Sequence, residues 1–140
     1  MGFTSIRAAI NTKLLAITEL AAVYRYHTFD MEKYPAATFE PSELASEFYT
    51  NSDDKNVYVF TIIIHQQIPP QGRDESLRRL LVAVDAVKTA LAADYNLGGV
   101  VDRSNTTAVT FGQYVEGNST VKFASFRYEC MAEERALPLP

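Results

Sequence analysis

Few residues in this sequence could take part in chemistry, and they form no recognisable catalytic motif. The chain has two histidines, His27 and His65, and one cysteine, Cys130. An enzyme needs an acid, a base and a nucleophile that converge on one site. His65, together with Asp85 or with a glutamate, is the only combination that could begin such a site. No nucleophile stands in a recognisable turn, so a small α+β hydrolase or transferase is an alternative and not the main interpretation.

The same residues give little support for a metal or a cofactor. A zinc site needs three or four converging donors, and two histidines without a cysteine pair do not supply them. A free cysteine usually packs as a small apolar residue, so we expect Cys130 to be buried. Gly98 and Gly99 lack the sequence of a phosphate-binding loop, and they follow a helical pattern instead of starting one. The sequence therefore predicts no catalytic residue, no metal and no cofactor.

An acidic stretch lies between residues 40 and 54. It contains no basic residue and five acidic ones, which are Glu40, Glu43, Glu47, Asp53 and Asp54. The simple interpretation is a solvated surface, and the sharper one is a negative wall that repels an acidic partner. The net charge of -4 argues against gripping nucleic acid as the main task of the chain.

A strand and a helix form the centre of the expected fold. Residues 57–64 are an apolar run of β-branched and aromatic side chains, typical of a buried strand. Residues 74–94 follow with apolar side chains at spacings of three and four, which predicts a helix packed on that strand. The expected buried stripe comprises Leu77, Leu80, Leu81, Val84, Val87 and Leu91.

The segments before this unit predict a further helix and a hairpin. Residues 4–22 carry a second helical pattern, and residues 34–41 read as a strand between two prolines, near a sheet edge. Short polar residues at 51–56 predict a turn, because their side chains bond to their own backbone. That turn would join residues 44–50 and 56–67 in a hairpin.

The last third of the chain predicts a second hairpin, of residues 106–115 with 120–131. Tight turns between strands favour an antiparallel sheet with helices on one face. We therefore expect one α+β domain over residues 1–131, with a mostly antiparallel sheet and two main helices packed on one of its faces. Residues 132–140 lack a core pattern and are expected to form a mobile tail.

Five features of the chain occur in a telling order. They are the amphipathic helix from Ile6 to Leu20, the strand from Tyr34 to Pro41, the apolar strand from Val57 to Ile64, the covering helix from Asp74 to Asp94, and the break Asn96-Leu97-Gly98-Gly99 before the last hairpin. In this order, over nearly the whole chain, they resemble the tail-terminator (tail-completion) proteins of long-tailed bacteriophages. The break after the covering helix is the most suggestive of the five.

That resemblance implies a structural virion protein without catalytic residues. Such proteins form a ring, typically a hexamer, on the last ring of tail-tube subunits, and they offer the other face to the head–tail connector protein. DNA passes through the ring without specific binding. The implied location is the head-proximal end of the tail in the virion, after assembly in the host cytoplasm. No apolar run reaches the ~20 residues that a membrane-spanning helix needs, so no membrane contact is expected.

The resemblance also suggests roles for particular residues. The five acidic residues of the 40–54 stretch become candidates for the wall of the lumen. Arg78 and Arg79, on the polar face of the covering helix, become candidates for subunit or partner contacts, as do the aromatic residues Phe48, Tyr49 and Tyr114. A head-completion or connector protein, a tail-tube protein, and a small ligand-binding module remain alternatives beside the enzyme.

Overall fold

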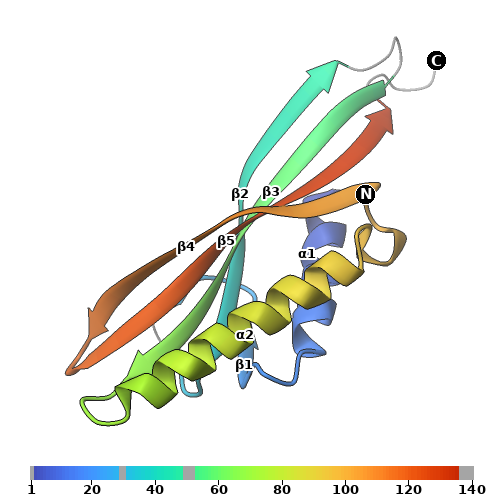
Figure 1. Cartoon of the computed structure of the whole chain (residues 1–140). Helices are drawn as coiled ribbons and strands as arrows, with labels where there is room; N and C mark the ends of the chain where they lie inside the picture. The colour runs from blue at the N-terminus through green and yellow to red at the C-terminus, as the bar shows by residue number, and fades with distance from the viewer. Residues whose placement is uncertain (1, 29–30, 49–52, 136–140) are drawn as a thin grey trace.

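The computed structural model describes residues 2–28, 31–48 and 53–135. The elements in chain order are α1 (Phe3–Leu15), β1 (Ala22–Tyr24), β2 (Ala36–Phe48), β3 (Asp53–Ile68), α2 (Arg73–Ala93), the short 3-10 turn η1 (Leu97–Gly99), β4 (Arg103–Glu116) and β5 (Ser119–Arg135). The strands form one sheet in the order β1-β2-β3-β5-β4, and both helices lie on one of its faces (Figure 1). Only β1 and β2 are parallel. The predicted α+β class, with a mostly antiparallel sheet, is confirmed.

Helix α2 begins and ends within one residue of the predicted helix. Gly72 precedes it with a φ of 76°, a left-handed conformation that glycine adopts without a Cβ clash. The buried members of the expected stripe are Leu80, Val84, Val87 and Leu91. The prediction was wrong for Leu77 and Leu81, which are 36% and 43% exposed. They lie beside Phe111 of β4, the outermost strand of the sheet, where no further strand covers them.

Helix α1 is shorter than predicted, because it ends at Leu15 and not near residue 22. Ile17 and Thr18 are both β-branched and favour a helix less than Ala or Leu do. The backbone N–H of Ile17 donates to the carbonyl of Leu14 at 3.1 Å, which is a tightened last turn. Ile17 still reaches the core through this turn. The chain is then free to form β1 beside β2.

The hairpin predicted from the polar turn is confirmed, but its first arm is one continuous strand. β2 runs from Ala36 to Phe48 and carries a bulge between Pro41 and Glu43, at the end of the strand predicted over residues 34–41. The turn predicted over residues 51–56 was wrong for residues 53–56, which begin β3 and pair with β2 and β5. The hydroxyl of Ser42, the extra residue, donates to the carbonyl of Val59 at 3.1 Å. Because β1 pairs only with residues 36–38, β2 is an edge of the sheet from residue 39 onward among the described residues.

The predicted end of the domain at residue 131 was wrong, because β5 continues to Arg135. β3 begins at Asp53 and therefore offers pairing positions as far as Arg135. The strand alternation directs Ala132 to the helix-covered face, where it is fully buried in the core. The remainder of the predicted tail, residues 136–140, lies outside the described residues.

The two faces of the sheet differ in what covers them. The helix-covered face holds the apolar core, in which the largest sheet side chains are Phe39, Phe60, Ile62, Phe126 and Tyr128. Cys130 is buried there as expected, and burial raises the pKa of its thiol to about 12. The helix-free face carries the alternate residues of the same strands, among them His65, Arg127 and Glu129.

Candidate assembly surfaces

The sheet extends well beyond the helices at one end. There β2, β3 and β5 continue as a three-stranded ribbon (Figure 1, upper right). We call this ribbon the extension and define it as residues 43–48, 53–59 and 129–135, which are aligned by the strand register. By sequence it carries seven acidic and two basic residues, whereas the whole chain has 17 and 13. The excess of negative charge in the chain therefore lies in the extension.

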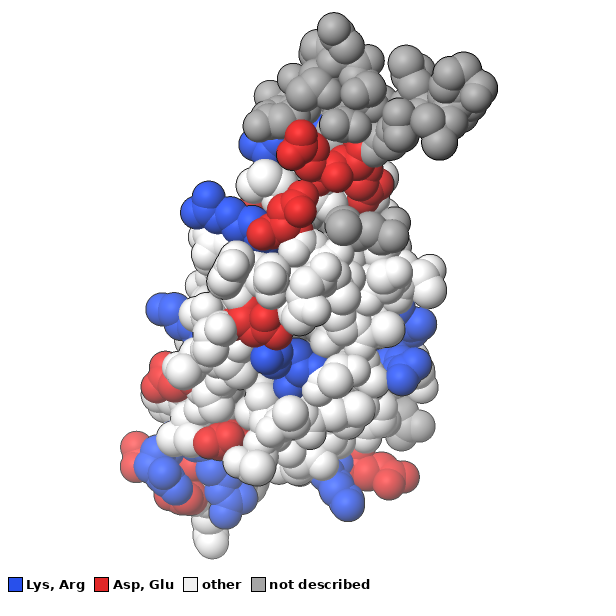
Figure 2. Space-filling view, turned by 90° about the vertical axis from the view of Figure 1, so that its right-hand side faces the viewer, with Lys and Arg blue, Asp and Glu red and all other residues white. Residues whose placement is uncertain are grey.

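The acidic residues singled out in the sequence do not form an unbroken negative wall. The carboxylate of Glu43 lies 3.1 Å from the guanidinium of Arg127, which also contacts Glu129 at 3.0 Å. Glu40 lies nearer the helices, 3.9 Å from His27 Nε2. Strand pairing thus brings a basic residue of β5 among the carboxylates, which the sequence analysis did not foresee. Acidic side chains nevertheless gather toward the end of the extension (Figure 2).

The other three acidic candidates belong to the strands of the extension by their backbone. Glu47 pairs with Lys55, Asp54 with Glu134, and Asp53 with Arg135. Their side chains lie outside the described part of the structure. That these five residues line a lumen stays a prediction.

A polar row holds the extension together on the helix-covered face. The hydroxyl of Tyr58 donates to Glu134 Oε1 at 2.7 Å, and Asn56 Nδ2 donates to Glu134 Oε2 at 3.1 Å. The Ser46 hydroxyl donates to Asn56 Oδ1 at 2.6 Å, so the row crosses all three strands. Burial and the neighbouring Glu134 carboxylate raise the pKa of the Tyr58 phenol to about 12. Sequence analysis missed Glu134 because it was assigned to the tail.

The two arginines proposed for contacts are exposed on α2 and pair within their own helix. Arg78 lies 2.7 Å from Glu75, and Arg79 lies 3.6 Å from the same carboxylate. The hydrogen bond from Arg78 lowers the pKa of Glu75. An exposed pair on one helix is what solvated arginines form, and it does not mark an interface by itself.

The aromatic candidates do not gather at one surface. Tyr114 is half-buried on the helix-free face, with its hydroxyl 3.0 Å from His65 Nδ1. Phe48 ends β2, and its side chain is outside the described atoms, as is the whole of Tyr49. Its hydrogen bond to His65 and its partial burial therefore explain the position of Tyr114, and neither marks an interface.

Instead, the structure shows an exposed apolar patch that the sequence analysis missed. We call it the β4 patch; its members are Leu77 and Leu81 of α2 with Phe111 of β4, and Val115 is a further exposed apolar residue of the same strand. Phe111 and Val115 are 58% and 73% exposed, and strand alternation places both on the helix-covered side. A groove of about 390 Å³ runs between Leu77, Leu81 and Phe111. Exposed apolar patches of this kind mark contact surfaces.

The outer edge of β4 is also open to pairing. From Ser104 to Val115 the strand contains neither a charged residue nor a proline, and its one bulge, between Thr106 and Ala108, leaves the run from Ala108 to Val115 regular. Natural proteins usually protect a long edge strand with lysines, prolines or bulges, because its unpaired backbone groups bind other strands. The free edge of β2 has such protection in Pro41, the bulge and its glutamates. The uncharged run in the sequence is the feature from which this open edge could have been predicted.

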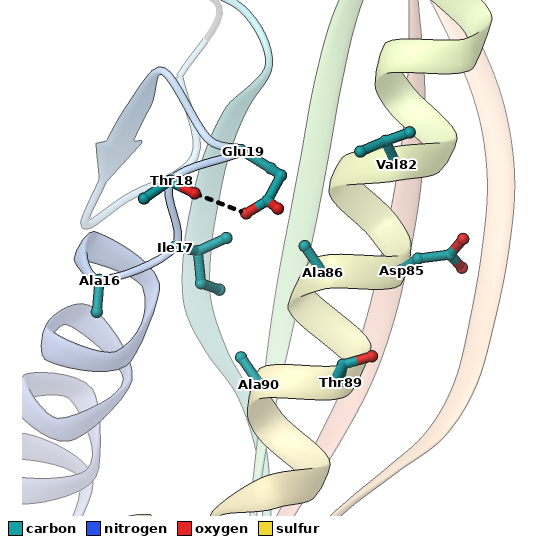
Figure 3. A pocket seen from close by; sticks show the side chains of 9 residues that line it. All are labelled: Ala16, Ile17, Thr18, Glu19, Val82, Asp85, Ala86, Thr89 and Ala90. Carbon is teal, nitrogen blue, oxygen red and sulfur yellow. Dashed lines mark hydrogen bonds between the residues drawn. The ribbon is translucent and has the colours of Figure 1, made fainter.

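The residues considered for catalysis are not brought together. His65 lies on the helix-free face, whereas Asp85 projects from α2 on the opposite side of the sheet. Asp85 lines an open groove between α2 and the turn after α1, whose floor includes Ile17, Ala86 and Ala90 (Figure 3). Its carboxylate points away from Ile17 and Glu19 (Figure 3). The structure therefore does not bring His65 and Asp85 together in one site.

Comparison with known proteins does not supply a family. No protein-family model matches the chain, and a search of curated proteins finds no match. Among residues 2–28, 31–48 and 53–135, no group of three or more His, Cys, Asp and Glu is placed to hold a metal ion. Over the same residues, neither helix combines the length and the apolar character needed to span a bilayer.

Proposed function

We propose that this protein is a structural subunit of a closed ring that caps the tail tube of a long-tailed bacteriophage. The observation that carries the proposal is the extension: its inner end packs Tyr58, Cys130 and Ala132 into the core, and its outer part continues past the helices as a ribbon held by polar side chains. Such a ribbon contributes little to the stability of one chain, but it gives a neighbouring copy a long contact surface. The order of elements that resembles tail terminators supports the same function.

The sheet edges suggest how copies would join. Strand direction alternates from β2 through β3 and β5 to β4, so β4 of one copy would run antiparallel to β2 of an equally oriented neighbour. This contact is heterologous, since two different surfaces meet, and such contacts build rings when the rotation closes. Pro41 lacks an N–H, so pairing along β2 would begin after the bulge, at Glu43.

The charge of the extension fits a channel through which DNA moves. Carboxylates on the lumen wall would repel the phosphates of the DNA and prevent the DNA from binding to the wall. In this proposal the extension lines the opening, one rim of the ring contacts the tail-tube protein, and the other rim contacts the head–tail connector protein. DNA passes without specific binding.

The first test is the molar mass by light scattering over a concentration series, with negative-stain images of the same samples. We expect closed rings with a central hole at high concentration or on added tail-tube ends. A Thr110→Lys variant places a charge on the open edge of β4 and should prevent ring formation. A Thr12→Lys variant adds the same charge on the exposed side of α1 and should assemble normally. Open-ended tubes would indicate a tail-tube protein, and a monomer that ignores tube ends would contradict the proposal.

The charge of the lumen can be tested on the assembled ring. The triple variant Glu40→Lys, Glu43→Lys and Glu47→Lys should retain DNA at low salt, whereas the unmodified ring should not. The matched control changes three exposed acidic residues elsewhere, Glu19, Glu32 and Asp85, to lysine. Equal retention by both triple variants, measured by co-sedimentation with linear DNA, would show that net charge and not position matters, and would contradict the placement of the β2 residues 40–47 at the lumen.

A further inference from the structure

A row of four hydrogen-bonded side chains crosses the helix-free face of the sheet. His27 Nδ1 lies 2.9 Å from Thr38 Oγ1, which lies 2.9 Å from His65 Nε2. His65 Nδ1 in turn lies 3.0 Å from the hydroxyl of Tyr114. The four residues belong to the segment after β1, to β2, to β3 and to β4. The row therefore ties the segment after β1 to the sheet.

The row borders a cavity with apolar walls. Thr38 and His65 are almost completely buried, and the cavity of about 400 Å³ beside them is lined by Ile63 and Phe123 as well as by His27, Thr28, His65 and Tyr114. Ile63 and Phe123 are half-buried, and because His27 and Thr28 form one wall of the cavity, the segment at residues 25–28 shields part of their apolar surface.

The number of protons in the row decides whether it can form. Thr38 has a single hydroxyl proton, so it donates to one histidine and accepts from the other. With both rings neutral this is satisfied: Tyr114 donates to His65 Nδ1, His65 Nε2–H donates to Thr38, and Thr38 donates to His27 Nδ1. With both rings protonated, each would donate to the one oxygen of Thr38. The hydroxyl proton would then be left without either ring as acceptor, and two positive charges would flank one buried atom.

The charged groups around the row oppose a second proton. Burial lowers the pKa of His65 to about 4, and the charge of His27 lowers it further. Burial also lowers the pKa of His27, against an opposing effect of Glu40 on β2. At the other end, Tyr34 and Glu116 face Tyr114 and raise the pKa of its phenol, after burial itself. No basic group is among these neighbours, and Glu40 is the one carboxylate among the described residues that favours a charged His27.

We infer that the row is an acid-released latch: it holds residues 25–28 over the cavity while both histidines are neutral, and protonation of the pair opens it. The inference does not depend on the proposed ring, since it concerns one chain. When the latch opens, more of the apolar wall made by Ile63 and Phe123 becomes accessible to water and to apolar probes.

The chain allows an unusually clean test, because its only two histidines both lie in the row. We would follow the imidazole Cε1 protons by NMR from pH 8 to pH 4, together with the fluorescence of an apolar dye such as ANS. We expect His65 to titrate well below pH 6.5, and dye binding to rise several-fold over the pH range in which the second histidine becomes protonated.

The control is the histidine-free double variant His27→Gln and His65→Gln, whose amides stay neutral over this range. It should show no rise in dye binding in the range where His65 titrates in the unmodified chain. A rise equal to that of the unmodified chain would overturn the inference, because carboxylates would then be its cause. If the double variant does not fold, the NMR titration of the unmodified chain decides alone: two independent titrations near pH 6.5 would overturn the latch.

Discussion

The two faces of the sheet are built from the same strands and are stabilised in different ways. On the helix-covered face, large apolar side chains such as Phe60 and Phe126 are shielded from water by α1 and α2. On the helix-free face, the buried residues Thr38 and His65 are held by hydrogen bonds in one row. The stability of the helix-covered face depends on how completely apolar side chains fill its volume, and that of the helix-free face depends on the protonation state of its histidines. Experiments that change one property at a time should therefore affect the faces separately.

The largest effect is expected from a cavity in the helix-covered face. Phe60 is fully buried there, so Phe60→Ala should lower the free energy of unfolding by about 3–5 kcal/mol. Phe111→Ala is the matched control on the same side, because Phe111 is exposed in the β4 patch. Urea denaturation at one low protein concentration measures both. Similar losses would mean that the helices do not cover the main core.

The second effect is a dependence of stability on pH that comes from the other face. The pKa of His65 is about 4 in the folded chain and near its ordinary value of 6.5 in the unfolded chain. The unfolded chain therefore binds the proton first as the pH falls, and stability is lost between pH 6.5 and pH 4. The loss should be on the order of 2 kcal/mol at pH 4.5 relative to pH 7.

This pH dependence is measured by urea denaturation at the two pH values. The His65→Gln variant provides the control, since it removes the titrating ring while keeping an amide that can bond to Thr38. If the variant showed the same pH dependence, carboxylates and not His65 would cause the loss of stability at low pH. The proposed difference between the two faces would then be wrong.

A smaller effect is expected at the extension, where the helix-covered side changes from apolar to polar. Tyr58→Phe removes the hydroxyl that donates to Glu134 and should cost about 1 kcal/mol. Tyr95→Phe is the control, because Tyr95 is 63% exposed. Equal stability of the two variants in urea would indicate that the extension does not need its polar row.

The smallest effect is expected for the exposed ion pairs of the helix-free face. Arg127→Ala removes the contacts with Glu43 and Glu129, which lie at a solvated surface. Water and salt screen such pairs, so the change in stability should be close to the error of the measurement and should vanish at 1 M salt. A large loss of thermal stability that persists at high salt would show that this surface is less solvated than its exposure indicates.

Local patterns were sufficient to predict most of the fold. The apolar run at 57–64 and the spacing of Leu80, Val84 and Val87 identified the central strand and its helix, because burial imposes a period of two on strands and 3.6 on helices. The ends of α1 and β5 were wrong. The length of a strand depends on the strand it pairs with, and Asp53 lies too far from Arg135 in the chain for a local pattern to reveal their pairing.

The candidate surfaces were harder to predict for the same reason. The acidic stretch was visible, but Arg127, which partly neutralises it, comes from another strand. The β4 patch combines Leu77 with Phe111, and only the position of α2 over the last strand brings them together. His27 and His65 were considered singly, since nothing in the sequence indicates that Thr38 lies between them.

The length of β3 has a mechanical consequence. It pairs with β5 from Asp53 to Ile68 and with β2 from Asp54 to His65, so one strand runs from beneath the helices to the tip of the extension. A force along the tip would load these hydrogen bonds in shear, all at once, instead of opening them in sequence. We expect single-molecule pulling between the tip and α1 to show one rupture for the extension and the core together; two separate ruptures would show that the bulge after Pro41 acts as a hinge.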